Sequence, residues 1–517
     1  MLAIDMPIID MLGGWWVAYA PIALLSLYFL TQALYSLSLL VDCYLFSRPV
    51  NMIDMGERFQ LVPGSRKDYP AIVLFYPVLE EQESVMRTTM IALDELEYPK
   101  DRYRVIAIPN SSDLVTVAAL KNLQAEFPFL ELLEVPPTDH PSWQPVWDAW
   151  NSNPKAYWWH QGANAYNKDL PPKKTRQLVY AFYNWMTTNP EEGTLMSYTD
   201  ADSCPPKDHF LAAAIGSRKY RVMQAKNVAG NASLTWPSTF CAFDHMAWDG
   251  SKYEHLSGDP RQPYWMLGKG LFFHAQDIHD LGGFHPWITI EDPEVGLRLW
   301  KNGKTLGIME GSLIEEAPTT FANAILQRKR WIAGFFQTLK FRNGPMDRMG
   351  FSFIEKIKAW LIFLPCLTMS LNCFGLPLSV WAAVMWIDGT GILPEWCLYW
   401  SVANLGLYAF FMTSLYYRIW FRTKLIMDTT WERARYMLRI NPLFVGLWWM
   451  FWTIPLWIGY GMYRNNLGLV WERTLKKDDN KLLVRDRVAH GTLGYAEPKR
   501  LGYKPSEAGG DIALPQS

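Results

Sequence analysis

Hydrophobic residues are concentrated in long runs near the two ends of the chain, with a mixed pattern between them. From Met11 to Val41 no residue is charged, and this run exceeds the roughly 20 residues that a membrane-spanning helix needs. Apolar runs return in the last third of the chain, over 353–387, 393–417 and 442–462. The first of these opens with an amphipathic stretch, 353–358, which is typical of a helix on a membrane surface. The pattern predicts one N-terminal span, two to three C-terminal spans, and interface helices.

Basic residues beside these runs predict the orientation. Arg48 is the first basic residue, and it follows the N-terminal run. By the positive-inside rule the N-terminus then faces outward, and the next domain and the basic segment 418–439 lie in the cytoplasm. If 442–462 crossed the membrane, Arg464 and Arg473 would lie outside, so we favour a re-entrant or interfacial placement for it. We therefore predict an integral protein of the plasma or inner membrane with a cytoplasmic central domain.

Between the apolar ends, from about 68 to 345, short apolar runs alternate with helical patterns. Strands are expected at 71–76, 103–108, 130–135 and 194–196, and helices at 81–96, 115–127 and 173–186. Continuous apolar runs are typical of buried parallel strands, and the alternation predicts a doubly wound α/β sheet. Residues 137–172 are rich in Pro, Trp, Asn and Lys without a clear period, so we interpret them as a long functional loop.

Composition agrees with a membrane protein. Of the 517 residues 50% are hydrophobic and 26 are Trp, a residue that gathers at membrane interfaces. A net charge of −1 argues against nucleic acid as a partner, and the scattered cysteines and histidines predict neither a disulfide framework nor a zinc site. The chain divides into an N-terminal transmembrane segment, a cytoplasmic domain, an interface helix with C-terminal transmembrane segments, and a polar tail, with bounds 1–47, 48–350, 351–477 and 478–517.

Two carboxylates one residue apart, Asp200 and Asp202, directly follow the strand-like run 194–196. Open α/β sheets bind ligands at the carboxyl ends of their strands. Hard carboxylate oxygens there suit Mg²⁺ or Mn²⁺ bridging a diphosphate. The alternative is an ordinary Asp-rich turn, in which each side chain bonds its own backbone.

A second acidic pair, Glu291-Asp292, lies between a glycine-containing turn and a helix expected at 293–301. Asp292 is a candidate general base for an acceptor hydroxyl, with Glu291 raising its pKa or orienting it. The alternative is that Asp292 only caps the helix.

The segment from Gln327 to Trp331 is predicted to be helical. Gln327, Arg330 and Trp331 stand at i, i+3 and i+4, so they share one face. Together they offer hydrogen-bond donors for a diphosphate and a flat ring for stacking. The alternative is a basic helix facing lipid headgroups. Lys174 has a similar alternative, a solvated charge pair with Lys173 ahead of a helix.

Taken together, these motifs resemble the family 2 membrane glycosyltransferases of the GT-A fold, the group of cellulose, chitin and hyaluronan synthases, over about 15–475. Asp200-Ala201-Asp202 matches the metal and diphosphate motif, Glu291-Asp292 the catalytic-base motif, and Gln327-Arg328-Lys329-Arg330-Trp331 the Gln-x-x-Arg-Trp motif in full. Pro77-Val78-Leu79-Glu80-Glu81 resembles the opening Pro-x-x-Asn-Glu, and Trp471-Glu472-Arg473-Thr474 a late Trp-x-x-Thr element.

One departure concerns the nucleotide. The family usually has Asp-Asp at the end of the second strand, where base and ribose bind, but here 108–113 reads Ile-Pro-Asn-Ser-Ser-Asp. Asn110 and Asp113 are the candidates to substitute. Lys174 falls where the family often has a nucleotide-contacting Lys, although its surroundings depart from the family pattern.

The resemblance implies an inverting hexosyltransferase that uses Mn²⁺ or Mg²⁺ and a nucleotide-diphosphate sugar, with a UDP-sugar as the first candidate. The implied donor contacts are Asp200, Lys174, Gln327, Arg330, Glu81, Asn110 and Asp113. Trp331 would hold the acceptor. The complete Gln-x-x-Arg-Trp motif favours processive synthesis of an exported β-linked polysaccharide. Two alternatives stay open: transfer of one sugar to a lipid, as glucosylceramide synthases do, or an inactive relative that serves as a receptor or assembly subunit. The sequence does not indicate an oligomeric state or partner subunits.

Overall fold

The computed structural model describes residues 7–159, 168–389 and 394–465. Part of the loop predicted at 137–172, the element at 471–474 and the predicted polar tail lie outside the described residues.

A seven-stranded sheet in the order β3-β2-β1-β4-β6-β5-β7 forms the centre of the structure. Its strands are β1 (Ile72–Tyr76), β2 (Tyr103–Ala107), β3 (Leu130–Leu132), β4 (Leu195–Tyr198), β5 (Val222–Ala229), β6 (Leu271–His274) and β7 (Leu306–Glu315). β6 runs antiparallel to β4 and β5, whereas every other neighbouring pair in this sheet is parallel. The predicted α/β class is confirmed, but the sheet is mixed, and β3 is shorter than expected.

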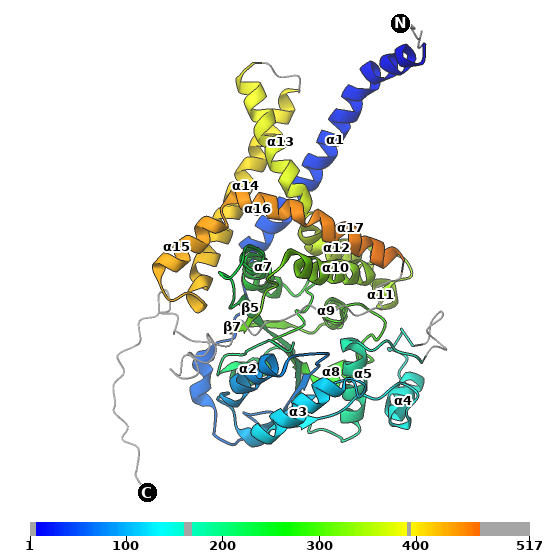
Figure 1. Cartoon of the computed structure of the whole chain (residues 1–517), viewed down its shortest axis with the longest axis vertical. Coiled ribbons are helices and arrows are strands. Elements are labelled where there is room, and N and C mark those ends of the chain that lie inside the picture. The colour runs from blue at the N-terminus through cyan, green and yellow to red at the C-terminus, as the bar shows by residue number, and fades with distance from the viewer. Residues whose placement is uncertain (1–6, 160–167, 390–393, 466–517) are drawn as a thin grey trace.

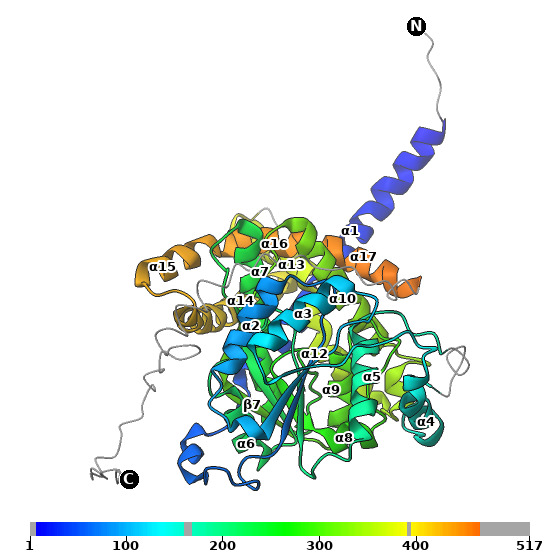
Figure 2. The same cartoon turned by 60° about the horizontal axis from the view of Figure 1, so that its bottom comes forward.

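The continuous apolar run of β1 is explained by burial on both faces of the sheet. Leu74 and Tyr76 belong to one core, with side chains from α2 (Glu83–Asp94), α3 (Leu114–Glu126) and α6 (His209–Ser217). Val73 and Phe75 belong to the other core, with α5 (Lys174–Met186), α8 (Ala275–Asp280) and α9 (Asp292–Lys301). In Figure 2 α5, α8 and α9 lie to the right of the strands and α6 to the left. The sheet is therefore covered by helices on both faces, as a doubly wound fold requires.

The segment predicted as an irregular loop contains helical structure. A 3₁₀ turn, η3 (Pro141–Trp143), leads into α4 (Gln144–Ser152). Trp143, Trp147 and Trp150 are spaced by four and three residues, which puts them on one face of a helix. They are buried with Trp159, whose ring stacks on Trp150 with centroids 4.5 Å apart. The prediction was wrong here because the many prolines and asparagines of the segment obscured this aromatic stripe.

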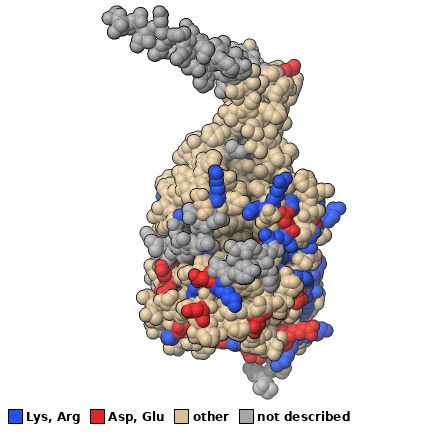
Figure 3. Space-filling view, turned by 90° about the vertical axis from the view of Figure 1, so that its right-hand side faces the viewer, with Lys and Arg blue, Asp and Glu red and all other residues tan. Residues whose placement is uncertain are grey.

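Three long helices rise from the domain as a stalk: α1 (Pro7–Ser47), α13 (Met369–Ile387) and α14 (Glu395–Arg422) (Figure 1). α16 (Pro442–Phe451) and α17 (Thr453–Arg464) lie across its base. By length and composition, two helical stretches among the described residues could cross a membrane, Leu25–Phe46 and Pro442–Arg464. In the face shown in Figure 3 the described part of the stalk carries almost no Lys, Arg, Asp or Glu, and charged residues lie on the domain below it.

Polar side chains join the stalk helices inside their interface. Gln32 of α1 donates from Nε2 to the carbonyl of Gly375 at 3.0 Å, and its Oε1 accepts from Ser379 Oγ and Asn404 Nδ2 at 3.0 and 2.6 Å. Ser36 Oγ donates to Asn404 Oδ1 at 2.8 Å. Such interhelical hydrogen bonds are typical of helices that associate in a bilayer.

The remaining elements lie between these strands and helices along the chain. They are η1 (Met55–Gln60), η2 (Lys100–Arg102), α7 (Trp236–Ala247), the π-helical turn η5 (Trp248–Lys252), η6 (Tyr253–Gly258), α10 (Phe321–Thr338), α11 (Pro345–Arg348), α12 (Phe353–Leu367), η7 (Thr423–Leu425) and α15 (Thr430–Arg439).

Candidate active site

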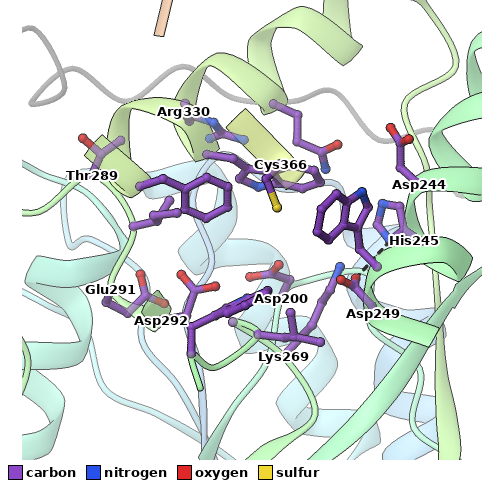
Figure 4. A pocket seen from close by; sticks show the side chains of 18 of the residues that line it. Asp200, Asp244, His245, Asp249, Lys269, Thr289, Glu291, Asp292, Arg330 and Cys366 are labelled. Carbon is purple, nitrogen blue, oxygen red and sulfur yellow. Dashed lines mark ion pairs between the residues drawn. The ribbon is translucent and has the colours of Figure 1, made fainter. Parts of the chain in front are cut away.

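A cavity lies between the carboxyl end of β4 and the helices at the base of the stalk, and Figure 4 shows the side chains that line it. The sheet side contributes Lys174, Asp200, Glu291 and Asp292. From the other side α10 contributes Gln327, Arg330 and Trp331. The structure thus brings together seven of the eleven predicted site residues from four separate segments.

Lys174 is the centre of the acidic side of the cavity. Its Nζ donates to Asp200 Oδ1 at 2.8 Å and to the carbonyl of Gly268 at 3.1 Å, and lies 3.1 Å from Glu291 Oε1. Burial opposes the charge of Lys174, but Asp200 and Glu291 outweigh it and hold its pKa above the ordinary value. Lys174 is therefore not part of a solvated charge pair.

Lys173 has a different role from its neighbour. Its Nζ is buried and donates to the carbonyl of Ile288 at 2.7 Å, just before the acidic pair. Burial lowers the pKa of Lys173 to about 7. This lysine therefore holds the segment that carries Asp292.

Asp292 is the first residue of α9, one residue earlier than the sequence predicted. The N-cap position belongs to Glu291, and its side chain makes no capping hydrogen bond. Burial, and then the neighbouring charge of Glu291, raise the pKa of Asp292 to about 8, against the opposing effect of Lys174. A carboxylate with a pKa near neutrality, on a cavity wall, matches the demand on a general base.

The helix with the Gln-x-x-Arg-Trp motif is locked to this acidic segment. The backbone N–H of Thr289 donates to Gln337 Oε1 of α10 at 2.7 Å. Gly334 lies so close to Ile290 that a Cβ on the glycine would be 2.1 Å from Ile290 Cγ1. The next turns of α10 toward its N-terminus therefore face the cavity, and Gln327 Oε1 is buried there with no hydrogen-bond partner among the described residues.

Arg328 is not among the residues that line the cavity, but its partner Asp244 is, and the importance of this arginine was not predicted. It is fully buried and forms an ion pair with Asp244 of α7, with Nη2 and Oδ2 2.5 Å apart. Trp448 and Trp452 donate from Nε1 to the same carboxylate at 3.0 and 3.2 Å. A basic helix that faced lipid headgroups would expose Arg328, so the structure does not support that alternative for this face of α10.

Asp202 is buried behind Asp200. Its Oδ2 accepts from the backbone N–H of Glu316 at 2.9 Å, which ties the turn after β4 to the end of β7. No group of three or more His, Cys, Asp or Glu side chains among the described residues is arranged to hold a metal ion. Mg²⁺ and related ions are commonly held by one or two carboxylates, with substrate phosphates and water completing the shell. Asp200 lines the cavity and Asp202 does not, so Asp200 is the candidate ligand on the cavity side and Asp202 the candidate behind it.

Three predicted donor-binding residues, Glu81, Asn110 and Asp113, line a separate groove beside the first two strands. Asn110 Oδ1 accepts from Arg176 Nη2 at 2.9 Å. Asp113 caps α3 by accepting from Thr116 N at 3.2 Å, and its other oxygen accepts from Glu80 N at 2.6 Å. Both carboxylate oxygens of Asp113 are thus engaged with backbone, which suits a helix cap better than a nucleotide ligand.

Sequence reasoning missed the wall of the cavity formed by His245, Asp249, Lys269 and Glu315. These residues come from the end of α7, from η5, from the loop before β6 and from the end of β7. Only Glu315 could have been predicted from the sequence, because it is the last residue of a long apolar strand. Asp200 was predicted for a similar reason, since it closely follows β4. The others lie in stretches without a recognisable spacing.

Comparisons with solved structures give distant likenesses. PcManGT, a mannosyltransferase from Pyrobaculum calidifontis solved in complex with GDP-Man and Mn²⁺, aligns with a TM-score of 0.43 and 16% identity over 76% of this chain and 97% of its own. TarS 1–349 from S. aureus, solved with UDP-GlcNAc, aligns with a TM-score of 0.31 and 9% identity over 67% of this chain and 91% of its own.

Sequence comparisons are more informative. A beta-monoglucosyldiacylglycerol synthase from Synechocystis sp. is 24% identical over 284 residues, and the chain spans about half the length of that relative, since the match covers 53% of this chain and 50% of the other. The family model described as glycosyl transferase family group 2 matches residues 197–464, more than half of the chain, and this range includes Asp200, Asp292 and Arg330. The chain therefore belongs to glycosyl transferase family group 2.

Proposed function

We propose that this protein is an integral membrane enzyme that transfers a sugar from a nucleotide-diphosphate donor with inversion at the anomeric carbon. The observation that carries the proposal is the arrangement of Asp292 in the cavity, opposite Gln327 and Arg330 of α10 and beside the Lys174–Asp200 pair. The carboxylate of Asp292 is placed to accept a proton. The guanidinium of Arg330 and the amide of Gln327 are placed to bind the leaving diphosphate.

The leaving diphosphate would be held by positive charge and by hydrogen-bond donors. Lys174, already placed at Asp200, and Arg330 supply charge, and Gln327 supplies an amide. Such groups stabilise charge that develops as the bond to the sugar breaks. A Mn²⁺ or Mg²⁺ ion on Asp200 and Asp202 would add Lewis-acid neutralisation of the same diphosphate.

In the transfer step the acceptor hydroxyl oxygen forms a bond to the anomeric carbon while the bond from that carbon to the diphosphate oxygen breaks. Asp292 takes the hydroxyl proton, and the diphosphate leaves with the bonding electron pair. The pKa of Asp292, about 8, makes it a competent base near neutral pH. A single displacement inverts the configuration and needs no second carboxylate as nucleophile, as inverting glycoside chemistry in general shows.

The nearly charge-free stalk in Figure 3 and the polar network around Gln32 support insertion of the stalk into a bilayer. α16 and α17 pack on the catalytic domain instead. Trp448 and Trp452 bond to Asp244, and Gly459 lies against α10, where a Cβ would be 2.7 Å from the Lys329 carbonyl. These contacts favour an interfacial position for 442–464, on the cytoplasmic side with the catalytic domain.

Two acceptor classes remain as candidates. The complete Gln-x-x-Arg-Trp motif on α10 favours a growing β-linked polysaccharide, exported across the membrane. The relative named as a beta-monoglucosyldiacylglycerol synthase favours transfer of one sugar to a lipid. The presence of Asp292 and Arg330 in one cavity argues against an inactive relative acting as a receptor or assembly subunit.

The test is release of nucleotide diphosphate by the purified full-length protein, with a panel of UDP- and GDP-sugars and Mn²⁺ or Mg²⁺. The Asp292→Asn variant should lose release, whereas Asp280→Asn, an exposed carboxylate at the end of α8, should keep it. The length of the product made from radiolabelled donor then distinguishes a polymer from a lipid monoglycoside. Absence of release with every donor would overturn the proposal.

A further inference from the structure

Four ionisable side chains outside the predicted motifs form one wall of the cavity. Figure 4 shows His245, Asp249 and Lys269 on the side away from Glu291, with Asp200 and Asp292 between the two sides. Glu315, from the end of β7, completes this group. We call His245, Asp249, Lys269 and Glu315 the polar wall.

The polar wall mixes donors and acceptors at short range. Lys269 Nζ forms an ion pair with Glu315 Oε2, and His245 Nδ1 lies 3.7 Å from Asp249 Oδ2 and 4.0 Å from Glu315 Oε1. The last two distances are too long for direct hydrogen bonds. Glu315 Oε1 is buried and has no hydrogen-bond partner among the described residues. A buried acceptor without a hydrogen bond lowers the stability of the fold unless a ligand or a water molecule donates one to it.

Aromatic rings adjoin the polar wall. Trp248, Trp331 and Trp452 line the same cavity, and the ring of His245 meets that of Trp331 edge-on with centroids 6.1 Å apart. A flat apolar surface beside alternating donors and acceptors matches a sugar ring, which has C–H faces and a rim of hydroxyls. The hydroxyl of a diacylglycerol would need only Asp292, and it would leave the polar wall without a partner.

We infer that the polar wall is the binding subsite for the sugar ring of the acceptor, so that the acceptor is a glycan end or a glycolipid headgroup rather than a diacylglycerol. Asp249 and Glu315 accept hydrogen bonds from the sugar hydroxyls, and Lys269 donates one. The Trp faces hold the ring while Asp292 deprotonates the attacking hydroxyl. This inference rests on the proposed function, and it chooses between the two acceptor classes by chemistry.

The experiment measures nucleotide release by the full-length protein in lipid nanodiscs, with the active donor and Mn²⁺, against two kinds of probe. One is a set of short alkyl β-glycosides with glucose, galactose, mannose or N-acetylglucosamine headgroups, and the other is dioleoylglycerol. A glycoside should accelerate release, and dioleoylglycerol should not. Asp249→Asn and Glu315→Gln should raise the KM for the glycoside about tenfold, the loss of one charged hydrogen bond, with the KM for the donor unchanged within about twofold.

The Glu315→Gln variant could fold poorly, because it leaves the buried Lys269 without its partner carboxylate. The Asp249→Asn variant avoids this problem, because it leaves the Lys269–Glu315 pair intact. Asp280→Asn is the control for a carboxylate outside the cavity. Donor release without acceptor, and the melting temperature, show whether each variant is folded.

Two results would overturn the inference: acceleration by dioleoylglycerol with no effect of any glycoside, or a glycoside KM that neither variant changes while donor release persists. A wild-type protein that releases no nucleotide with any donor would count against the proposed function instead. Calorimetric titration of the glycoside into the protein with bound UDP and Mn²⁺ needs no turnover. Binding that weakens in Asp249→Asn would support the subsite in that case too, and unchanged binding would overturn it.

Discussion

Gly334 of α10 packs directly against Ile290, two residues before Asp292, and a methyl group on the glycine would approach Ile290 Cγ1 to 2.1 Å. The same helix carries Gln327, Arg330 and Trp331 on its cavity face. The distance between Asp292, the proposed base, and α10, the proposed diphosphate-binding helix, is therefore set by a contact in which only hydrogen fits.

Replacement of Gly334 by Ala should push α10 away from the base segment. Overpacking of this kind costs about 1–3 kcal/mol in stability. We expect a lower melting temperature and a fall in kcat of about tenfold, because misplacement of catalytic groups weakens the transition state more than the substrate complex. Gly446→Ala in α16, where a Cβ meets nothing within 4 Å, is the matched control. Unchanged kcat in Gly334→Ala would contradict this account.

Replacement of the carboxylate of Asp292, the proposed base, should lower kcat. For Asp292→Asn we expect kcat to fall by about 10²–10⁴-fold, the usual contribution of a general base, with donor affinity retained. The measurement is the initial rate of nucleotide release together with a titration of UDP. A variant that keeps more than a tenth of wild-type kcat would show that another group removes the proton.

The pH dependence follows from the raised pKa of Asp292. The base works in its ionised form, while burial and Glu291 favour the protonated form up to about pH 8. kcat/KM should therefore rise with pH and level off above about 8. Glu291→Gln removes the neighbouring negative charge, lowers the pKa of Asp292, and should shift the rising limb to lower pH. A shift to higher pH would exclude this electrostatic role of Glu291.

Arg328 should contribute to the stability of the fold. Arg328→Ala leaves Asp244 as a buried carboxylate without its cation, a change that costs about 3–5 kcal/mol. We expect a large fall in the melting temperature, and detachment of α16 and α17, because Trp448 and Trp452 bond to the same carboxylate. Limited proteolysis between α15 and α16 would detect the detachment of α16 and α17. Arg342→Ala, an exposed arginine just after α10, should leave both readouts unchanged.

Chelation of divalent ions should abolish transfer. Activity lost on addition of EDTA should return with Mn²⁺ or Mg²⁺, since Asp200 and Asp202 provide hard oxygen ligands. Asp202→Asn should raise the metal concentration needed for half-maximal activity. Full activity after exhaustive chelation would show that Lys174 and Arg330 suffice for the leaving diphosphate.

Local sequence determined those features of this protein that depend on neighbouring residues. The apolar run of β1 predicted a buried strand, and the spacing of Gln327, Arg330 and Trp331 put them on one helix face because the helical period is 3.6 residues. Asp200 was expected at the ligand-binding edge because it follows a strand. The same reasoning overlooked α4, whose Trp spacing was helical in a segment dominated by breakers.

Only the tertiary structure decided which distant residues meet. Lys174 contacts Asp200, Arg328 contacts Asp244, and Glu315 approaches His245 only after the sheet and its helices have packed. Burial and partners then set each role: Asp113 became a helix cap, and Asp292 acquired a raised pKa in a cavity that no single segment forms. The sequence pattern determines which residues share a strand or a helix face. Burial and contacts between distant segments determine the pKa and the role of each side chain.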